Sequence, residues 1–178
     1  MGIFVSDGAF LNGTNVKNNE ERILRPLLLD ETMLIEELSN KAFRVAIIKA
    51  KNIFESGVGF EFEDFGLNNP SDASGKIFVQ AFELIENAKL AEIFCSFTGN
   101  LSELCFTYSQ IVRFCEKYPH QLRQEGSANF FLLKTKEDYF VANIKACSDG
   151  LKAGVNYFKF GPVWNGNDRH RIFVPAIF

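Results

Sequence analysis

The sequence lacks the short motifs that mark the common catalytic and cofactor-binding sites. It contains neither a GxxxxGK[ST] nor a GxGxxG phosphate-binding loop, and it has no Gly-x-Ser-x-Gly nucleophile turn. Its cysteines do not occur in CxxC spacing, and its two histidines, His120 and His170, do not form an HxxxH pair. We therefore expect no cofactor and no bound metal, and the balance of the sequence favours a non-enzymatic protein.

Long apolar runs are also missing. No stretch approaches the ~20 apolar residues that a membrane-spanning helix needs. Residues 1–7 have no basic flank and carry an acid, unlike a signal peptide. These absences predict a cytoplasmic protein of bacterial or phage type, without a membrane partner.

In the cytoplasm, cysteines are expected to remain reduced thiols rather than to form a disulfide framework. The four cysteines are Cys95, Cys105, Cys115 and Cys147. The first three stand among apolar residues, so we expect them to be mostly buried. Cys147 follows a predicted strand and is the thiol least expected to be buried, which makes it a weak candidate nucleophile.

Positive charge is unevenly distributed along the chain. The first 100 residues hold 9 basic and 15 acidic side chains, whereas the remaining 78 hold 10 and 7, for a formal net charge of −3. A nucleic-acid-binding protein normally needs a strongly basic face. Nucleic acid is therefore not an expected partner, but a local site for a small anionic ligand in the C-terminal half remains open.

Phenylalanine is the residue type in clear excess, with 20 copies beside a single tryptophan. One explanation is a nucleotide bias toward Phe codons, and the other is an aromatic contact surface. The segment 60–65 alternates Phe with acidic residues, which predicts an edge strand with its aromatics inward. The alternative for this segment is an acidic rim around a partner site.

Patterning predicts an α+β fold in a single domain, 1–178. The part 129–178 is expected to be mainly β, as an antiparallel meander of about four strands, because short apolar runs alternate there with polar breaks. The part 20–118 is expected to be mainly helical and to cover one face of that sheet, and 1–19 is expected to form a small hairpin or an extended arm. The predicted strands are 129–134, 139–146, 155–160 and 169–174, and the predicted helices are 30–55, 76–91 and 101–118.

The connections between these elements carry further expectations. Four polar residues between the first two strands indicate a hairpin turn, and Asn165-Gly166 indicates a second one. Residues 147–150 should link the two hairpins, followed by a short helical turn at 151–153. The apolar tail, 172–178, should be ordered and packed, since leaving it free would expose several large side chains together.

One cluster could carry chemistry. Arginine binds carboxylate or phosphate with two parallel hydrogen bonds, and histidine titrates near neutral pH. The cluster could therefore form a small anion-binding or acid–base site, or it could be a solvated strand start with one arginine stacked on the indole ring. Its members are Trp164, Asp168, Arg169, His170 and Arg171.

From the missing catalytic signatures, the aromatic content and the split charge, we expect a small macromolecular interaction module. Its partner would be another protein or a second copy of the chain. The alternative is a small enzyme that acts on an anionic substrate at Arg169, His170 and Arg171. A deep pocket that holds His170, Asp168 and an arginine would favour the enzyme, and an apolar patch would favour the module.

Overall fold

The computed structural model describes residues 23–39, 45–67, 69, 72, 74–97 and 99–176. Within these ranges, nine strands form one mixed sheet, and two short strands form a second. The strands of the large sheet are β1 (Leu24–Pro26), β2 (Met33–Ile35), β3 (Gly57–Val58), β4 (Ile77–Leu84), β6 (Cys105–Phe106), β7 (Ala128–Lys134), β8 (Tyr139–Cys147), β9 (Gly150–Tyr157) and β11 (Arg171–Pro175). The small sheet pairs β5 (Ala88–Lys89) with β10 (Val163–Trp164).

The helical elements of the described ranges are short. The α-helices are α1 (Glu61–Asp64), α2 (Leu90–Cys95) and α3 (Tyr108–Lys117). The 3-10 turns are η2 (Ile47–Lys49), η3 (Leu101–Leu104), η4 (Pro119–Gln121) and η5 (Gly166–Asp168). Of the helices in the described ranges, none is long and apolar enough to cross a membrane.

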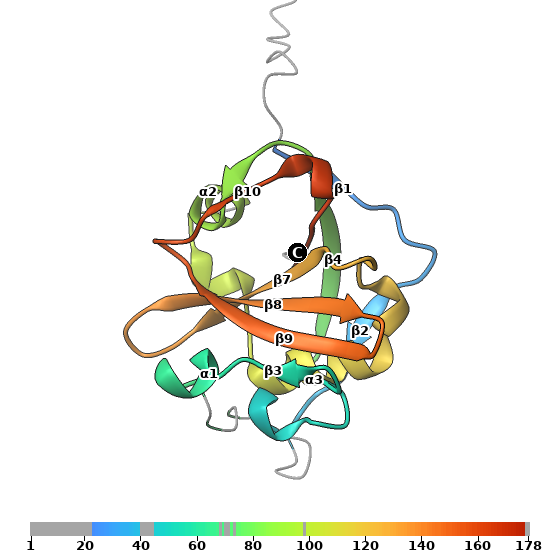
Figure 1. Ribbon diagram of the computed structural model, residues 1–178, viewed down its shortest axis with the longest axis vertical. Helices are drawn as coiled ribbons and strands as arrows, with labels where there is room; N and C mark the ends of the chain where they lie inside the picture. Colours follow the sequence, from blue (N-terminus) through green and yellow to red (C-terminus); the bar gives the residue numbers. More distant parts are fainter. Residues whose placement is uncertain are drawn as a thin grey trace, which may run out of the picture.

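The large sheet is organised around β4, β11 and β7. β11 pairs antiparallel with β4 and parallel with β7, so it lies inside the sheet. β8, β9 and β3 extend the sheet beyond β7, and β6 pairs with the second half of β7. β1 and β2 pair one after the other with the outer edge of β4. In Figure 1, β8 and β9 cross the front of the molecule while β4 stands nearly upright, so the sheet is strongly twisted.

The first predicted hairpin is confirmed. β7 and β8 pair antiparallel along their whole length, and the Thr135 N–H donates to the Asp138 carbonyl at 2.9 Å across the turn. Polar residues at a short break between two apolar runs were sufficient to locate this turn, because both strands and their connection are adjacent in the sequence.

The expected α+β architecture is wrong. In place of a four-stranded meander covered on one face, the described chain forms a nine-stranded mixed sheet that is buried on both faces. Phe131 and Leu133 of β7 pack with α3 on one face, whereas Phe130 and Leu132 pack with α2 on the other. Each such side chain contributes about 1.5–3 kcal/mol when fully buried. A strand that is apolar on both faces needs neighbours on both edges and cover on both sides.

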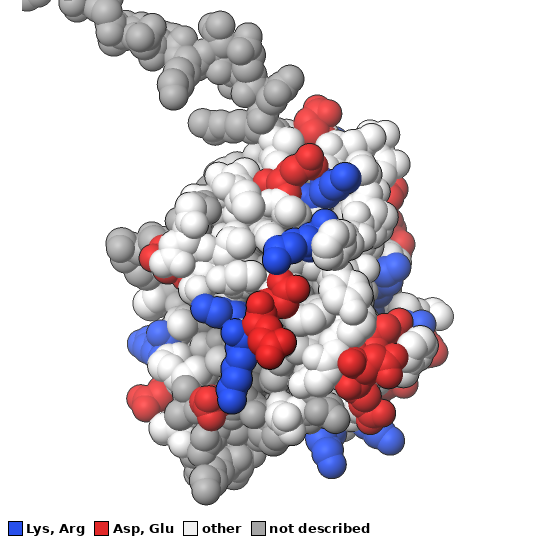
Figure 2. All heavy atoms as spheres, turned by 90° about the vertical axis from the view of Figure 1, so that its left-hand side faces the viewer, with Lys and Arg blue, Asp and Glu red and all other residues white. Residues whose placement is uncertain are grey.

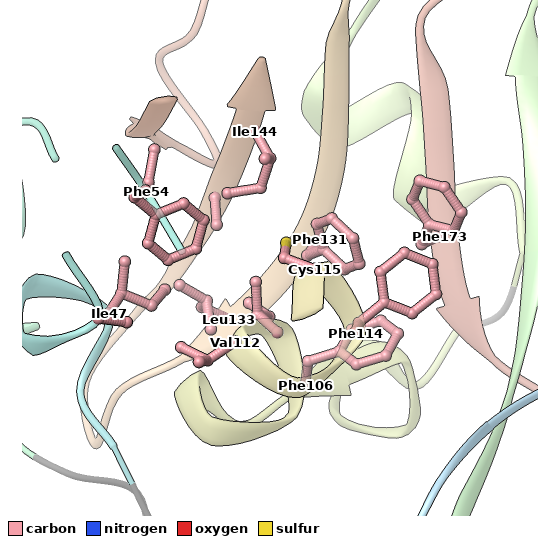
Figure 3. Packing of buried hydrophobic residues seen from close by; sticks show 14 of the residues in the cluster. Ile47, Phe54, Phe106, Val112, Phe114, Cys115, Phe131, Leu133, Ile144 and Phe173 are labelled. Atoms are coloured by element: carbon pink, nitrogen blue, oxygen red, sulfur yellow. The ribbon is translucent and has the colours of Figure 1, made fainter. Parts of the chain in front are cut away.

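The core on the α3 side is strongly aromatic. Phe131 and Phe173 stack with ring centroids 4.9 Å apart, and Phe114 of α3 meets both rings (Figure 3). Several of the 20 phenylalanines therefore serve the interior rather than a contact surface.

The second predicted hairpin does not form. β9 begins at Gly150, so 147–150 is a tight turn between β8 and β9, and 151–153 is strand instead of a helical turn. The segment predicted as 169–174 is β11, which pairs with β4 and β7 rather than with β9. Its partners are distant in the sequence, and a strand pattern does not specify which distant strand it will join.

Two of the predicted helices are also wrong. The segment 76–91 contains β4, β5 and the start of α2, and the segment 30–55 contains β2 and η2, with 40–44 outside the described residues. β4 is rich in β-branched and aromatic residues, and it pairs with neighbours on both edges. Those tertiary contacts override a helical spacing of apolar residues, which is a weak local preference.

The third predicted helix is shorter than expected. Residues 101–106 form η3 and β6, and α3 begins only at Tyr108, where Thr107 and Gln110 form a capping box. The end of the helix before Pro119 agrees with the prediction. The segment 60–65, expected to be an edge strand, contains α1, in which Phe62 is buried and the acids lie in the first turn.

At the chain ends, the tail prediction is partly tested. Ile172, Phe173 and Val174 of β11 are buried, so the described part of the tail is packed. Residues 177–178 and the hairpin or arm predicted within 1–19 lie outside the described residues.

Candidate functional site

The five predicted site residues are divided between the two faces of the sheet. Arg171 of β11 and Arg25 of β1 both lie opposite Glu83 of β4 in the strand register. Directly opposed residues on neighbouring strands project to the same face. Arg25, Glu83 and Arg171 therefore form a row across three strands, and His170, the neighbour of Arg171, lies on the opposite side.

Glu83 is the centre of this row. It is only 6% exposed, and its carboxylate accepts hydrogen bonds from Arg25 and from Arg169, the latter at 3.4 Å. Arg169 reaches Glu83 from the end of η5, where its backbone adopts a left-handed conformation with φ 53°. That conformation is unfavourable for a residue with a Cβ, so local contacts must hold it.

The turn η5 is held by close packing. A Cβ on Gly166 would lie 2.6 Å from the backbone of Ile85, and the Gly166 N–H donates to the Asn87 side chain at 2.9 Å. Asn165-Gly166 therefore begins a packed 3-10 turn instead of the predicted hairpin turn. This packing places Arg169 beside β4.

One hydrogen-bond donor of the Arg171 side chain has no partner in the part of the chain that the structure describes. Its Nη1 donates to the backbone carbonyl of Gln121, but its buried Nε has no hydrogen-bond partner among the described residues. Burial lowers the pKa of Arg171, the nearby Arg123 charge lowers it further, and Glu83 opposes the change. Three arginines thus lie near one carboxylate, and the group of Arg25, Arg169 and Arg171 with Glu83 is named the arginine cluster.

His170 lies in a different environment. It is 5% exposed, and its Nδ1 accepts the backbone N–H of Ala128 at 3.0 Å. Its Nε2 lies 3.6 Å from the exposed carboxylate of Asp168. Burial lowers the pKa of His170, with Asp168 acting in the opposite direction. The ring is a neutral hydrogen-bond acceptor that joins two strands.

Trp164 packs on the His170 side of the sheet. Its ring makes edge contacts with His170 at 5.0 Å and with Phe130 at 4.7 Å between centroids. The stacking partner anticipated from the sequence was an arginine. Arg169 and Arg171 instead point to Glu83 and Gln121, so the predicted cluster is two separate sets of contacts.

Two members of the arginine cluster were missed by sequence reasoning. Glu83 lies in the segment 76–91, which was predicted to be a helix, and Arg25 belonged to no motif. Residues 25, 83 and 171 meet only because β1, β4 and β11 pair in one register. No local signal in the sequence indicates that meeting.

A second feature is an apolar groove of about 350 Å³ beside β4. β1 and β2 both pair with β4, and the connection between them is the segment 27–32. The Leu27 N–H still donates to the Ala81 carbonyl of β4 at 2.9 Å, and the rest of the connection arches away from the sheet edge before β2 begins. The groove lies between this arch and β4. Leu28 at its rim is 99% exposed, and Phe78 is 36% exposed. The lining comprises residues 26–29, 31–33, 78–82 and Ala176.

Surface charge elsewhere is mixed. On the face shown in Figure 2, basic and acidic side chains lie close together and wide areas carry neither. Among the described residues, no group of three or more His, Cys, Asp or Glu side chains is placed to hold a metal ion.

No protein-family model, curated protein sequence or solved structure matches this chain. The fold and site define a twisted, mixed-sheet protein with an open apolar groove and an arginine cluster at the edge formed by β1 and β4.

Proposed function

We propose that this protein is a non-enzymatic interaction module that binds another protein through the groove between the 27–32 arch and β4. The observation that carries the proposal is the exposure of Leu28, at 99%, on the rim of an apolar groove. Leu27 and Leu29 on either side of it are partly buried against the core. Contiguous exposed apolar surface that lines a groove marks a site of interaction with a protein or a ligand.

The surroundings of His170 favour this reading over an enzyme. A general acid or base must reach the proton that it transfers. His170 is 5% exposed, its Nδ1 is engaged by Ala128, and the guanidinium of Arg171 lies on the opposite face of the sheet. We further propose a cytoplasmic location, in which the free thiols would stay reduced.

Site-specific photo-crosslinking in the native cell tests the proposal. A photoreactive amino acid at position 28 should give a covalent adduct of one defined mass, and the same amino acid at position 160 should not. Phe160 is the matched control because it is 83% exposed and does not line the groove. Excess wild-type protein should suppress the adduct, and excess Leu28→Asp protein should not. Identical adducts from both positions, or none from position 28, would overturn the proposal.

A second candidate function is the binding of a small anion by the arginine cluster. It is favoured by the buried Nε of Arg171, which has no hydrogen-bond partner within the described ranges, and by the two arginines that share the Glu83 carboxylate. Citrate and inorganic phosphate should then raise the melting temperature of the wild-type protein. Glu83→Gln should strengthen the response, since it removes the internal competitor, and Arg169→Gln should weaken it. An equal effect of chloride at the same ionic strength would contradict specific binding.

A further inference from the structure

We infer that the groove and the arginine cluster form one binding site, whose ligand is an extended apolar segment of a partner protein with a carboxylate beside its apolar residues. The inference rests on the proposed function and adds the chemistry of the partner. The groove binds the apolar side chains, and the arginine cluster binds the acid.

The two features are adjacent along the strands. Pro26 and Phe82 line one end of the groove and oppose each other in the register of β1 and β4. The next pair along the same ladder is Arg25 and Glu83. Successive strand residues are about 3.3 Å apart. The cluster therefore begins one residue step beyond the end of the groove.

The arginines also share a face with part of the groove. Strand side chains alternate, so Glu83 and Ala81 of β4 project to the same face, and Ala81 lines the groove. A second connection runs through η4. Glu31 in the groove lining accepts a hydrogen bond from the Gln121 side chain at 2.9 Å, and the Gln121 carbonyl accepts one from Arg171.

At the end of the groove beside Arg25, the charge of the arginine cluster favours a negatively charged ligand. Glu83 is shared between Arg25 and Arg169, which leaves the arginines with more donors than the carboxylate can accept. The side chain of Arg25 is 55% exposed, so it can reach a ligand without leaving β1. Glu31, the acid of the groove, is already engaged by His120 and Gln121. An incoming carboxylate would complete the arginine cluster with charge-assisted hydrogen bonds.

The opposite end of the groove is lined by Phe78, and the Ala176 N–H donates to the Phe78 carbonyl at 2.8 Å. The Lys76 Nζ lies 5.7 Å from the centroid of the Phe78 ring and interacts with that ring. A volume of about 350 Å³ lies in the range of small ligand pockets. The site therefore favours large apolar side chains toward Phe78 and an Asp, a Glu or a terminal carboxylate toward Arg25.

Selection from a displayed library of random linear peptides tests the inference with the intact protein as bait. Selected peptides should combine large apolar residues with a neighbouring Asp or Glu. Two or three of them are then synthesised, each with a twin in which the acid is replaced by Asn or Gln, and their dissociation constants are measured by fluorescence polarisation.

The expected pattern separates the two parts of the site. Leu28→Asp should weaken every peptide at least about tenfold. Arg25→Gln should weaken the acidic peptides by about tenfold and leave their neutral twins unchanged. Lys159→Gln is the matched charge control, because Lys159 is 60% exposed and pairs with Asp138 away from the groove. Should Arg25→Gln not fold, Arg169→Gln serves in its place, because Arg169 also donates a hydrogen bond to Glu83.

Three other outcomes would contradict the inference, and each contradicts a different part of it. Selected peptides without an acid, or equal affinity of acidic and neutral twins, would overturn the inference while the Leu28 crosslink still supports the proposed function. A concentration-dependent dimer of the protein that Leu28→Asp abolishes, with no peptide selected, would replace the peptide by a second copy of the chain. Failure of both the selection and the Leu28 crosslink would remove the proposed function itself.

Discussion

His170 accepts the backbone N–H of Ala128 through Nδ1 at 3.0 Å, and this contact extends the parallel pairing of β11 with β7 by one side-chain hydrogen bond. Only a neutral imidazole has a nitrogen that can accept. Protonation of His170 would therefore leave a charged ring whose Nδ1–H faces the Ala128 N–H, on a side chain that is only 6% exposed.

The first prediction is a loss of stability in mild acid. Burial lowers the pKa of His170 in the folded state, and Lys145 adds to this while Asp168 opposes it. The unfolded chain then binds more protons below its ordinary pKa of about 6.5. The free energy of unfolding should fall as the pH drops from about 6.5 toward the lowered value. Urea titrations at several pH values should show this loss in the wild type.

The control for this prediction is His170→Asn, whose side-chain oxygen can accept the Ala128 N–H without titrating. The variant should show a smaller loss between the same pH values. An unchanged pH dependence in His170→Asn would contradict the role assigned to His170.

The second prediction concerns the fluorescence of Trp164, which is the only tryptophan. Its ring lies 5.0 Å from that of His170, whereas Arg171 lies on the other face of the sheet. A charge that appears on His170 should change the emission of Trp164, because the indole ring interacts with a nearby cation. Acid titration of the folded protein should shift the emission, and His170→Asn should remove the shift. Phosphate at neutral pH should leave it unchanged.

The third prediction corrects the expectation for the cysteines. Cys95 is exposed, against the prediction that it is buried, whereas Cys115 is buried and Cys105 is half-buried. Burial raises the pKa of the Cys105 thiol to about 12 and also raises that of Cys115. A polar thiol reagent should label Cys95 and Cys147 rapidly in the native protein. It should reach Cys115 only on unfolding, as peptide mass mapping over time would reveal.

The fourth prediction tests the aromatic core. Phe173 is fully buried in β11 and packs on Phe131 and Phe114. Phe173→Ala should lower the free energy of unfolding by about 3–5 kcal/mol, through lost burial and the cavity that remains. Phe160→Ala, at an exposed position, should change it by about 0.5 kcal/mol or less. Similar losses in the two variants, measured by chemical denaturation, would show that β11 is not part of the central core.

Local sequence signals located the elements whose partners are close in the chain. The β7–β8 hairpin was predicted from a polar break of four residues, and the end of α3 was predicted from Pro119. These features depend on turn chemistry and on backbone geometry within a few residues. Composition and charge do not depend on tertiary contacts. The distribution of charge along the sequence was therefore enough to make nucleic acid an unexpected partner.

The tertiary structure decided the conformation of β4 and the composition of the site. The spacing of apolar residues in 76–91 fits a helix, but β4 gains pairing with β1, β2 and β11, and these partners come from both ends of the described chain. Arg25, Glu83 and Arg171 meet for the same reason. A local sequence pattern indicates which side chains are apolar enough to be buried. The register between distant strands determines which side chains become neighbours, and this register forms only when the whole sheet packs.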